Sequence, residues 1–87
     1  MVTTYKKPTK LQKETFEKIF GMMDQCTPYF LEQMTFQKRV ALYSEYSIEI
    51  ENAKHRHLLT NTQYDKLRSY LNKIASWIVE IPPRKMR

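Results

Sequence analysis

The sequence has very few of the residues that make tight turns. Glycine occurs once, at Gly21, and the 53 residues between Pro28 and Pro82 include neither glycine nor proline. β-Hairpins and other tight turns depend on residues that tolerate a positive φ or have a fixed one. A chain with so few of them reverses direction rarely. We therefore expect a few long helices and no sheet.

Cysteine and long apolar runs are also scarce. The single Cys26 cannot form an internal disulfide, which fits a reducing interior. It shares an apolar register with Phe16, Ile19 and Met23, so we expect a small core residue rather than a reactive thiol. No apolar run approaches the ~18 residues of a membrane span, and the first ten residues contain no signal-peptide segment. We expect a cytoplasmic, intracellular protein with no membrane partner.

Signatures of catalysis are missing as well. The sequence contains no glycine-rich phosphate loop, no serine elbow and no paired cysteines. His55 and His57 are two residues apart, so on a helix they point to nearly opposite sides. Glu51 and His55 are four apart and could share a metal ion, but such a pair is only half a site. We expect a protein that is not an enzyme and that has no cofactor and no metal site.

The apolar periodicity and the start signals of helices predict the architecture. We expect an all-α fold, namely a three-helix bundle-like domain with a long central helix. The predicted segments are a flexible basic arm over 1–8, a single helical domain over 9–81 with helices at about 10–25, 28–57 and 62–81, and a basic tail over 82–87. The start signals are Thr9 with Gln12, Thr27 before Pro28, and Thr62 with Asp65.

The central segment is apolar on two sides if it is helical. One stripe contains Tyr29, Phe36, Val40, Tyr43 and Ile50, and the other contains Phe30, Met34, Ala41 and Ile48. A helix that is apolar on two sides has neighbours on two sides. We expect it to pack on both other helices, or on one of them and a second copy, so a homo-oligomer is predicted. Residues 46–51 alternate like a strand, but no hairpin turn or second strand accompanies them.

Charge is distributed unevenly along the chain. The formal charge is +4 over residues 1–13, −4 over 14–51, +4 over 52–79 and +2 over 80–87, which gives the total of +6. Each lysine at the start of a helix interacts unfavourably with the helix macrodipole and lowers the stability of the helix by a few tenths of a kcal/mol. Four such lysines do not help folding, so the pattern favours an anionic partner, although plain solubility also explains it.

The first interpretation is a basic helical protein that binds nucleic acid without sequence specificity, as an accessory or regulatory factor. Phosphate contacts would come from Lys6, Lys7, Lys10, Lys13, Lys54, Arg56, Lys66, Lys73, Arg84, Lys85 and Arg87. Exposed Tyr5, Tyr64 or Tyr70 would stack on bases. No helix carries a dense set of base-reading Arg, Asn and Gln, and a helix-turn-helix fits the long central helix poorly.

The second interpretation is a helical protein–protein interaction module. Such a regulator, inhibitor or adaptor would self-associate and dock on a larger protein or nucleoprotein complex. Aromatic and aliphatic side chains would anchor the interface, and the candidates are Tyr29, Phe36, Tyr43, Tyr46, Ile50 and Trp77. The sequence alone leaves both interpretations open.

Overall fold

The computed structural model describes residues 7–82, which form four helices and no strand. The helices are α1 (Lys10–Asp24), α2 (Pro28–Glu32), α3 (Phe36–His55) and α4 (Asn61–Glu80). The predicted all-α class is therefore confirmed. Residues 46–51, which alternate like a strand, lie inside α3. Most of the predicted arm (1–6) and most of the predicted tail (83–87) lie outside the described residues.

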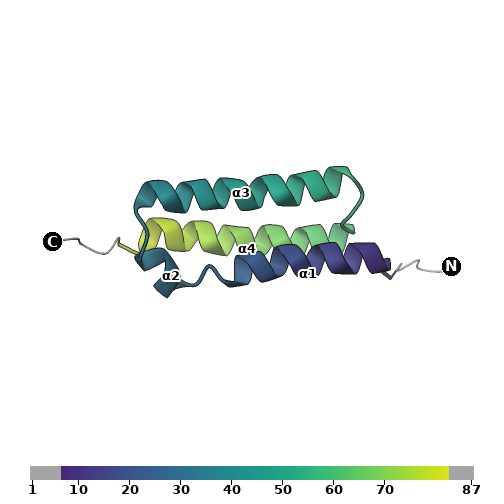
Figure 1. Ribbon diagram of the computed structural model, residues 1–87, viewed down its shortest axis with the longest axis horizontal. Helices are drawn as coiled ribbons and strands as arrows, with labels where there is room; N and C mark the ends of the chain where they lie inside the picture. The colour runs from purple at the N-terminus through teal and green to yellow at the C-terminus, as the bar shows by residue number, and fades with distance from the viewer. Residues whose placement is uncertain (1–6, 83–87) are drawn as a thin grey trace.

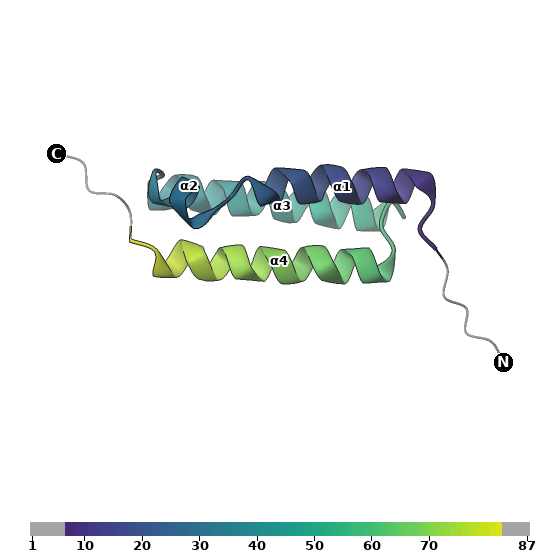
Figure 2. The ribbon, with the colours of Figure 1, turned by 90° about the horizontal axis from the view of Figure 1, so that it is seen from below.

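The three long helices lie side by side, and α2 continues the line of α1 (Figure 1). Each long helix contacts the other two, and Figure 2 shows α4 across from α1 and α3. Gln63 donates to the backbone oxygen of Gln12 at 3.4 Å, and Tyr70 donates to Asp24 at 3.1 Å, so α1 and α4 run parallel. The helix α3 runs antiparallel to both. The starts of α1 and α4 and the end of α3 therefore share one end of the molecule.

The core lies along the axis enclosed by these helices. Residues Leu67, Leu71, Ile74 and Ile78 of α4 are buried, as the apolar pattern predicts. They pack with the other buried apolar residues, which are Ile19, Met23, Cys26, Leu31, Tyr46, Ile50, Ala53 and Leu59. Full burial of one large aliphatic side chain contributes about 1.5–3 kcal/mol, so this cluster is the main source of stability.

The segment predicted to be helical at about 28–57 forms two helices and not one. The helix α2 ends at Glu32 and α3 begins at Phe36, with the N-cap at Thr35 between them. The Thr35 hydroxyl accepts a hydrogen bond from the backbone N–H of Lys38 at 3.2 Å. A threonine side chain competes for backbone donors in this way and starts a new helix without glycine or proline. The chain therefore breaks where no classical breaker is present.

The predicted caps of α1 and α2 are confirmed, but the cap of α4 is not where we expected it. Thr9 forms a capping box with Gln12, and Thr27 caps α2 before Pro28. In α4 the N-cap is Thr60, which forms a capping box with Gln63, and not Thr62 with Asp65. Both hydrogen bonds of the Thr60–Gln63 box measure 3.0 Å. The side chain of a glutamine at the third helical position accepts a hydrogen bond from the backbone N–H of the N-cap residue. The aspartate side chain is shorter and is less suited to reach that N–H.

Arg39 is fully buried, although nothing in the sequence marks it as a core residue. Its Nε donates to the backbone oxygen of Leu31 at 2.8 Å, at the end of α2. Its Nη1 donates to the oxygens of Ile78, at 3.2 Å, and Ile81, at the end of α4. Carbonyls at a helix C-terminus lack partners within the helix and carry partial negative charge. Arg39 therefore fastens α2 and α4 to α3 without a carboxylate.

Candidate functional site

Two basic segments, about forty residues apart in the sequence, meet at one end of the molecule. The side-chain Nε2 of Gln12 donates a hydrogen bond to the backbone oxygen of His57 at 3.3 Å. The first turn of α1 thus touches the connection between α3 and α4. We define the basic end as the side chains that gather here, which are Lys7, Lys10, Lys13, Lys54 and Arg56.

The electrostatics of the basic end favour anions. The N-termini of α1 and α4 both lie here, and neither helix has an acidic residue in its first turn. The positive ends of these two macrodipoles add to the lysine charges, while the negative end of α3 at the same end of the molecule offsets part of them. Within residues 7–82 the only ion pair joins Arg68 to Glu51 at 3.4 Å, so no carboxylate neutralises the basic end through an ion pair. Four of its five side chains are exposed.

Lys54 is the half-buried member of the basic end. Its Nζ lies 4.8 Å from the ring centroid of Tyr64, in a cation–π contact. The Tyr64 hydroxyl donates to Glu51 at 2.6 Å, and this hydrogen bond is the main reason that the pKa of Tyr64 is raised above its usual 10.0. Tyr64 is thus engaged on one face and at its hydroxyl. It orients Lys54 and is a poor candidate for stacking on bases.

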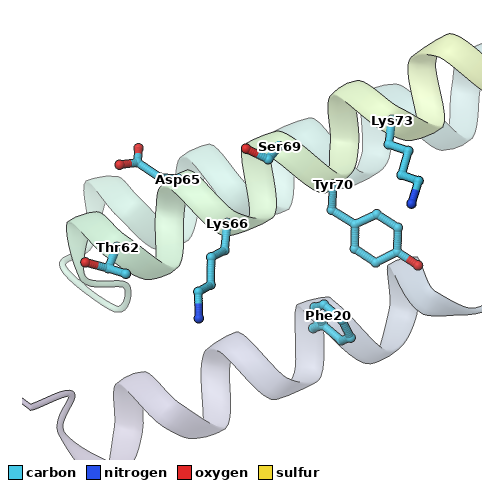
Figure 3. Close-up of a pocket in the computed structure, with 7 residues that line it drawn as sticks. All are labelled: Phe20, Thr62, Asp65, Lys66, Ser69, Tyr70 and Lys73. Carbon is cyan, nitrogen blue, oxygen red and sulfur yellow. The ribbon is translucent and has the colours of Figure 1, made fainter.

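Lys66 and Lys73 belong to a separate groove between α1 and α4. The groove is open, has a volume of ≈ 620 Å³ and also contains Phe20 and Tyr70. Figure 3 shows Lys66 and Lys73 on either side of Tyr70, all reaching from α4 toward α1, where Phe20 faces the tyrosine ring. The ring centroids of Phe20 and Tyr70 are 5.3 Å apart. Lys13 precedes Phe20 by two turns on the same side of α1, so the groove starts at the basic end.

The groove carries both signs of charge. Asp65 lines it, although Figure 3 shows this side chain turned away from α1. Asp24 accepts the hydrogen bond of the Tyr70 hydroxyl at 3.1 Å. Burial, and then this hydrogen bond, raise the pKa of Tyr70 above its usual 10.0. The groove therefore attracts phosphate less strongly than the basic end, and its distinguishing feature is the pair of aromatic rings.

Several residues of the predicted nucleic-acid contact lie outside the described residues. These are Tyr5, Lys6, Arg84, Lys85 and Arg87. The structure brings Lys7, Lys10 and Lys13 together with Lys54 and Arg56, and it separates Lys66 and Lys73 from them. This grouping is not visible in the sequence, because it follows from the parallel packing of α1 on α4.

Two of the predicted interface anchors are in the wrong place. Tyr46 and Ile50 are 5% and 0% exposed, so both belong to the core and are not available to a partner. The Tyr46 hydroxyl donates to the backbone oxygen of Met22 at 3.1 Å, and burial raises the pKa of Tyr46 to about 12. Tyr43 and Trp77 are half-buried, and Lys73 lies 5.6 Å from the Trp77 ring. Tyr29 and Phe36 are exposed.

The exposed side of α3 next to α4 carries no charge from its start to Ile48. We define the uncharged face as the exposed or groove-lining residues here, which are Phe36, Val40, Tyr43, Ala41, Ser44 and Ile48 of α3 and Ala75, Ile78 and Val79 of α4. A hollow of ≈ 190 Å³ between the two helices is lined only by members of this set. The charged Lys38, Glu45 and Glu49 follow at helical spacing on another side of α3.

The described residues offer little for bond-making chemistry. Within residues 7–82 no group of three or more His, Cys, Asp or Glu could hold a metal ion. Burial raises the pKa of the Cys26 thiol above 9.0, against a smaller lowering by Tyr46, so its nucleophilic thiolate is scarce at neutral pH. No helix in this part of the chain has the length and apolarity needed to cross a membrane.

Comparisons of the whole chain with protein-family models, with curated proteins and with solved structures found no match. The geometry and charge described above are therefore the basis of the functional proposals below.

Proposed function

We propose that this protein binds nucleic acid without sequence preference, through phosphate contacts at the basic end, as an accessory or regulatory factor. The observation that carries the proposal is the hydrogen bond from Gln12 to His57, because it holds the two basic segments side by side. Neither segment alone has more than three of the cations. Together they give this end of the molecule five cations.

The number of cations sets the expected strength. Each phosphate that a lysine or arginine neutralises releases condensed counterions, and log affinity then falls with log salt by roughly 0.7 to 0.9 per contact. Five contacts would give a slope of about −3.5 to −4.5. Binding of this kind typically has a dissociation constant of roughly 10⁻⁴ to 10⁻⁶ M at physiological salt. The proposal is thus a binder of modest affinity.

The lack of sequence preference follows from the side chains at the basic end. Bases are read in the major groove by bidentate Arg, Asn and Gln contacts from one recognition element. At the basic end, Gln12 is occupied by Thr9 and His57. Lysines predominate there and act as point charges.

The groove between α1 and α4 would supply a secondary contact. A strand that leaves the basic end past Lys13 meets Phe20 and Tyr70, with Lys66 and Lys73 beside them. An aromatic ring that stacks on a base contributes about 1–3 kcal/mol, whatever the base. A preference for single strands over duplex would follow from this contact, because only unpaired bases can reach the rings.

Fluorescence anisotropy of a labelled oligonucleotide at ~50 mM salt tests the proposal. The double variant Lys10→Gln/Lys13→Gln should bind several-fold more weakly than the unmodified chain. The single variants Lys13→Gln and Lys38→Gln form the matched comparison, because Lys38 is exposed near the start of α3, at the opposite end from the basic end. Lys38→Gln should bind nearly as well as the unmodified chain. The variant Lys66→Gln/Lys73→Gln isolates the groove. Absence of binding by the unmodified chain, or equal losses of affinity in Lys13→Gln and Lys38→Gln, would overturn the proposal.

A further inference from the structure

We propose that the uncharged face is the contact between two copies of this chain, related by a twofold axis that makes the copies antiparallel. In such a dimer the two basic ends lie at opposite poles. The dimer itself follows from the uncharged face, whereas its use, to hold two nucleic-acid segments at once, rests on the proposed function.

The first argument is exposure. On this face Phe36 is 53% exposed, Ile48 59% and Val79 77%, and Val40 is exposed beside them. Single exposed apolar residues are common, but a contiguous apolar patch on a small protein marks an interaction surface. The hollow of the face is lined by Phe36, Val40 and Val79, so these three exposed residues are contiguous, and Ile48 lies about two turns further along α3.

The second argument is the absence of charge. The chain is 28% charged residues, yet the face contains none over three turns of α3. The ion pair of Arg68 with Glu51 borders the face at its end near the basic end, where Arg68 also bonds Ser47 at 3.4 Å. Burying an unpaired charge in an interface is strongly unfavourable. This face has no charge to desolvate, and the nearest ions are already paired with each other.

The third argument identifies the occupant as a second copy. A twofold interface must be self-complementary, because the same surface serves both partners. The face carries both projecting side chains, Phe36 and Val79, and a hollow of ≈ 190 Å³ beside them. Each copy carries a net charge of +6, so copies repel unless their basic ends are far apart. The antiparallel arrangement pairs the uncharged faces and separates the basic ends.

The size of the face sets the expected affinity. The stretch from Phe36 to Ile48 is about 18 Å long, and neighbouring helix axes are about 8–10 Å apart. Such a contact lies at the low end of specific interfaces, below about 1,200 Å² in total. We expect a dissociation constant in the micromolar range and a monomer–dimer equilibrium that concentration shifts.

Sedimentation equilibrium from ~1 to ~500 μM tests the dimer. The unmodified chain should change from its monomer mass of 10.6 kDa toward twice that value. Ile48→Lys should weaken the dimer at least tenfold, while its circular dichroism spectrum stays helical. The control Leu11→Lys introduces the same charge at a residue of like exposure, 56%, off the face, and should dimerise as before. A mass of 10.6 kDa at every concentration, or equal dimerisation of the two variants, would contradict the proposed dimer. The uncharged face would then be a contact site for another protein.

A second readout separates this proposal from the proposed function. Energy transfer between donor- and acceptor-labelled oligonucleotides should rise when the unmodified chain bridges them. Ile48→Lys should bind a single short oligonucleotide with unchanged affinity but lose the transfer signal. If the protein dimerises but binds no oligonucleotide, the proposed function is wrong and the proposed interface stands. If the protein binds an oligonucleotide but stays monomeric at every concentration, the proposed interface is wrong and the proposed function stands.

Discussion

Arg39 Nη1 donates a hydrogen bond to the backbone oxygen of Ile78 at 3.2 Å, although the two residues are 39 positions apart. Through this bond and its partners, one buried guanidinium holds the ends of α2 and α4 against α3. The uncharged face begins beside this contact, because Phe36 precedes Arg39 by one turn and Val79 follows Ile78. Its geometry therefore depends on Arg39.

We expect Arg39→Met to lower the free energy of unfolding by about 2–4 kcal/mol. The change removes the side-chain donor of the Ile78 and Ile81 backbone oxygens, at roughly 1–3 kcal/mol each, whereas the Leu31 oxygen keeps the N–H of Met34 at 3.0 Å. Urea denaturation measures the loss. The neighbouring exposed Lys38→Met should stay within about 0.5 kcal/mol of the unmodified chain. Equal free energies of unfolding for the two variants would show that Arg39 does not stabilise the packing of α2 and α4 against α3.

The start of α4 gives a second prediction. Thr60→Ala removes the capping hydroxyl and should lower the free energy of unfolding by about 1 kcal/mol. Thr62→Ala, at the second residue of α4, should change it by less than about 0.5 kcal/mol. The reverse order in thermal or urea unfolding would contradict the Thr60 cap.

His57 offers a stabilising change. Its φ of 61° lies in the left-handed region, where it ends α3, and Leu58 N–H bonds the oxygen of Ala53 at 2.8 Å. Glycine adopts this conformation without strain, so His57→Gly should raise the free energy of unfolding by about 0.5–1 kcal/mol. The backbone oxygen that accepts from Gln12 is retained. A loss of stability in differential scanning calorimetry would contradict this account of the turn.

Alkaline pH should destabilise the protein through Tyr46. Burial raises its pKa from 10.0 to about 12, so the unfolded chain loses the phenolic proton first. The contribution to stability is therefore complete below pH 10.0 and is lost as the pH rises toward about 12. Melting temperatures measured across this range should fall less steeply for Tyr46→Phe. The same slope in both proteins would mean that other groups control alkaline unfolding.

The sequence predicts the fold class well, because the scarcity of turn residues constrains the whole chain. It does not reveal the break at Thr35, since a capping threonine inside an otherwise helical pattern looks like any surface threonine. The break does not explain the misplaced anchors, because Phe36, Tyr43 and Ile50 all lie in α3. A seven-residue stripe drifts by about 20° per repeat around a straight helix, and here it runs from the exposed Phe36 to the buried Ile50. The role of Arg39 is not visible in the sequence, because no neighbouring residue distinguishes a buried arginine from a solvent-exposed one.

The basic segments are visible in the sequence, but their meeting is not. Lys10 and Lys54 share one end of the molecule only because α1 packs parallel to α4 and antiparallel to α3. The capping glutamines provide this register, since Gln12 reaches His57 and Gln63 reaches Gln12. A cap signal in the sequence gives no sign that its side chain also joins two helices.

The salt dependence of binding tests the central claim most directly. With a fluorescent oligonucleotide, the plot of log affinity against log salt should have a slope of about −3.5 to −4.5 for the unmodified chain. The variant Lys54→Gln/Arg56→Gln should make that slope shallower by about 1.4 to 1.8, since two phosphate contacts are lost. An affinity that does not change with salt, or an unchanged slope in the variant, would contradict binding at the basic end.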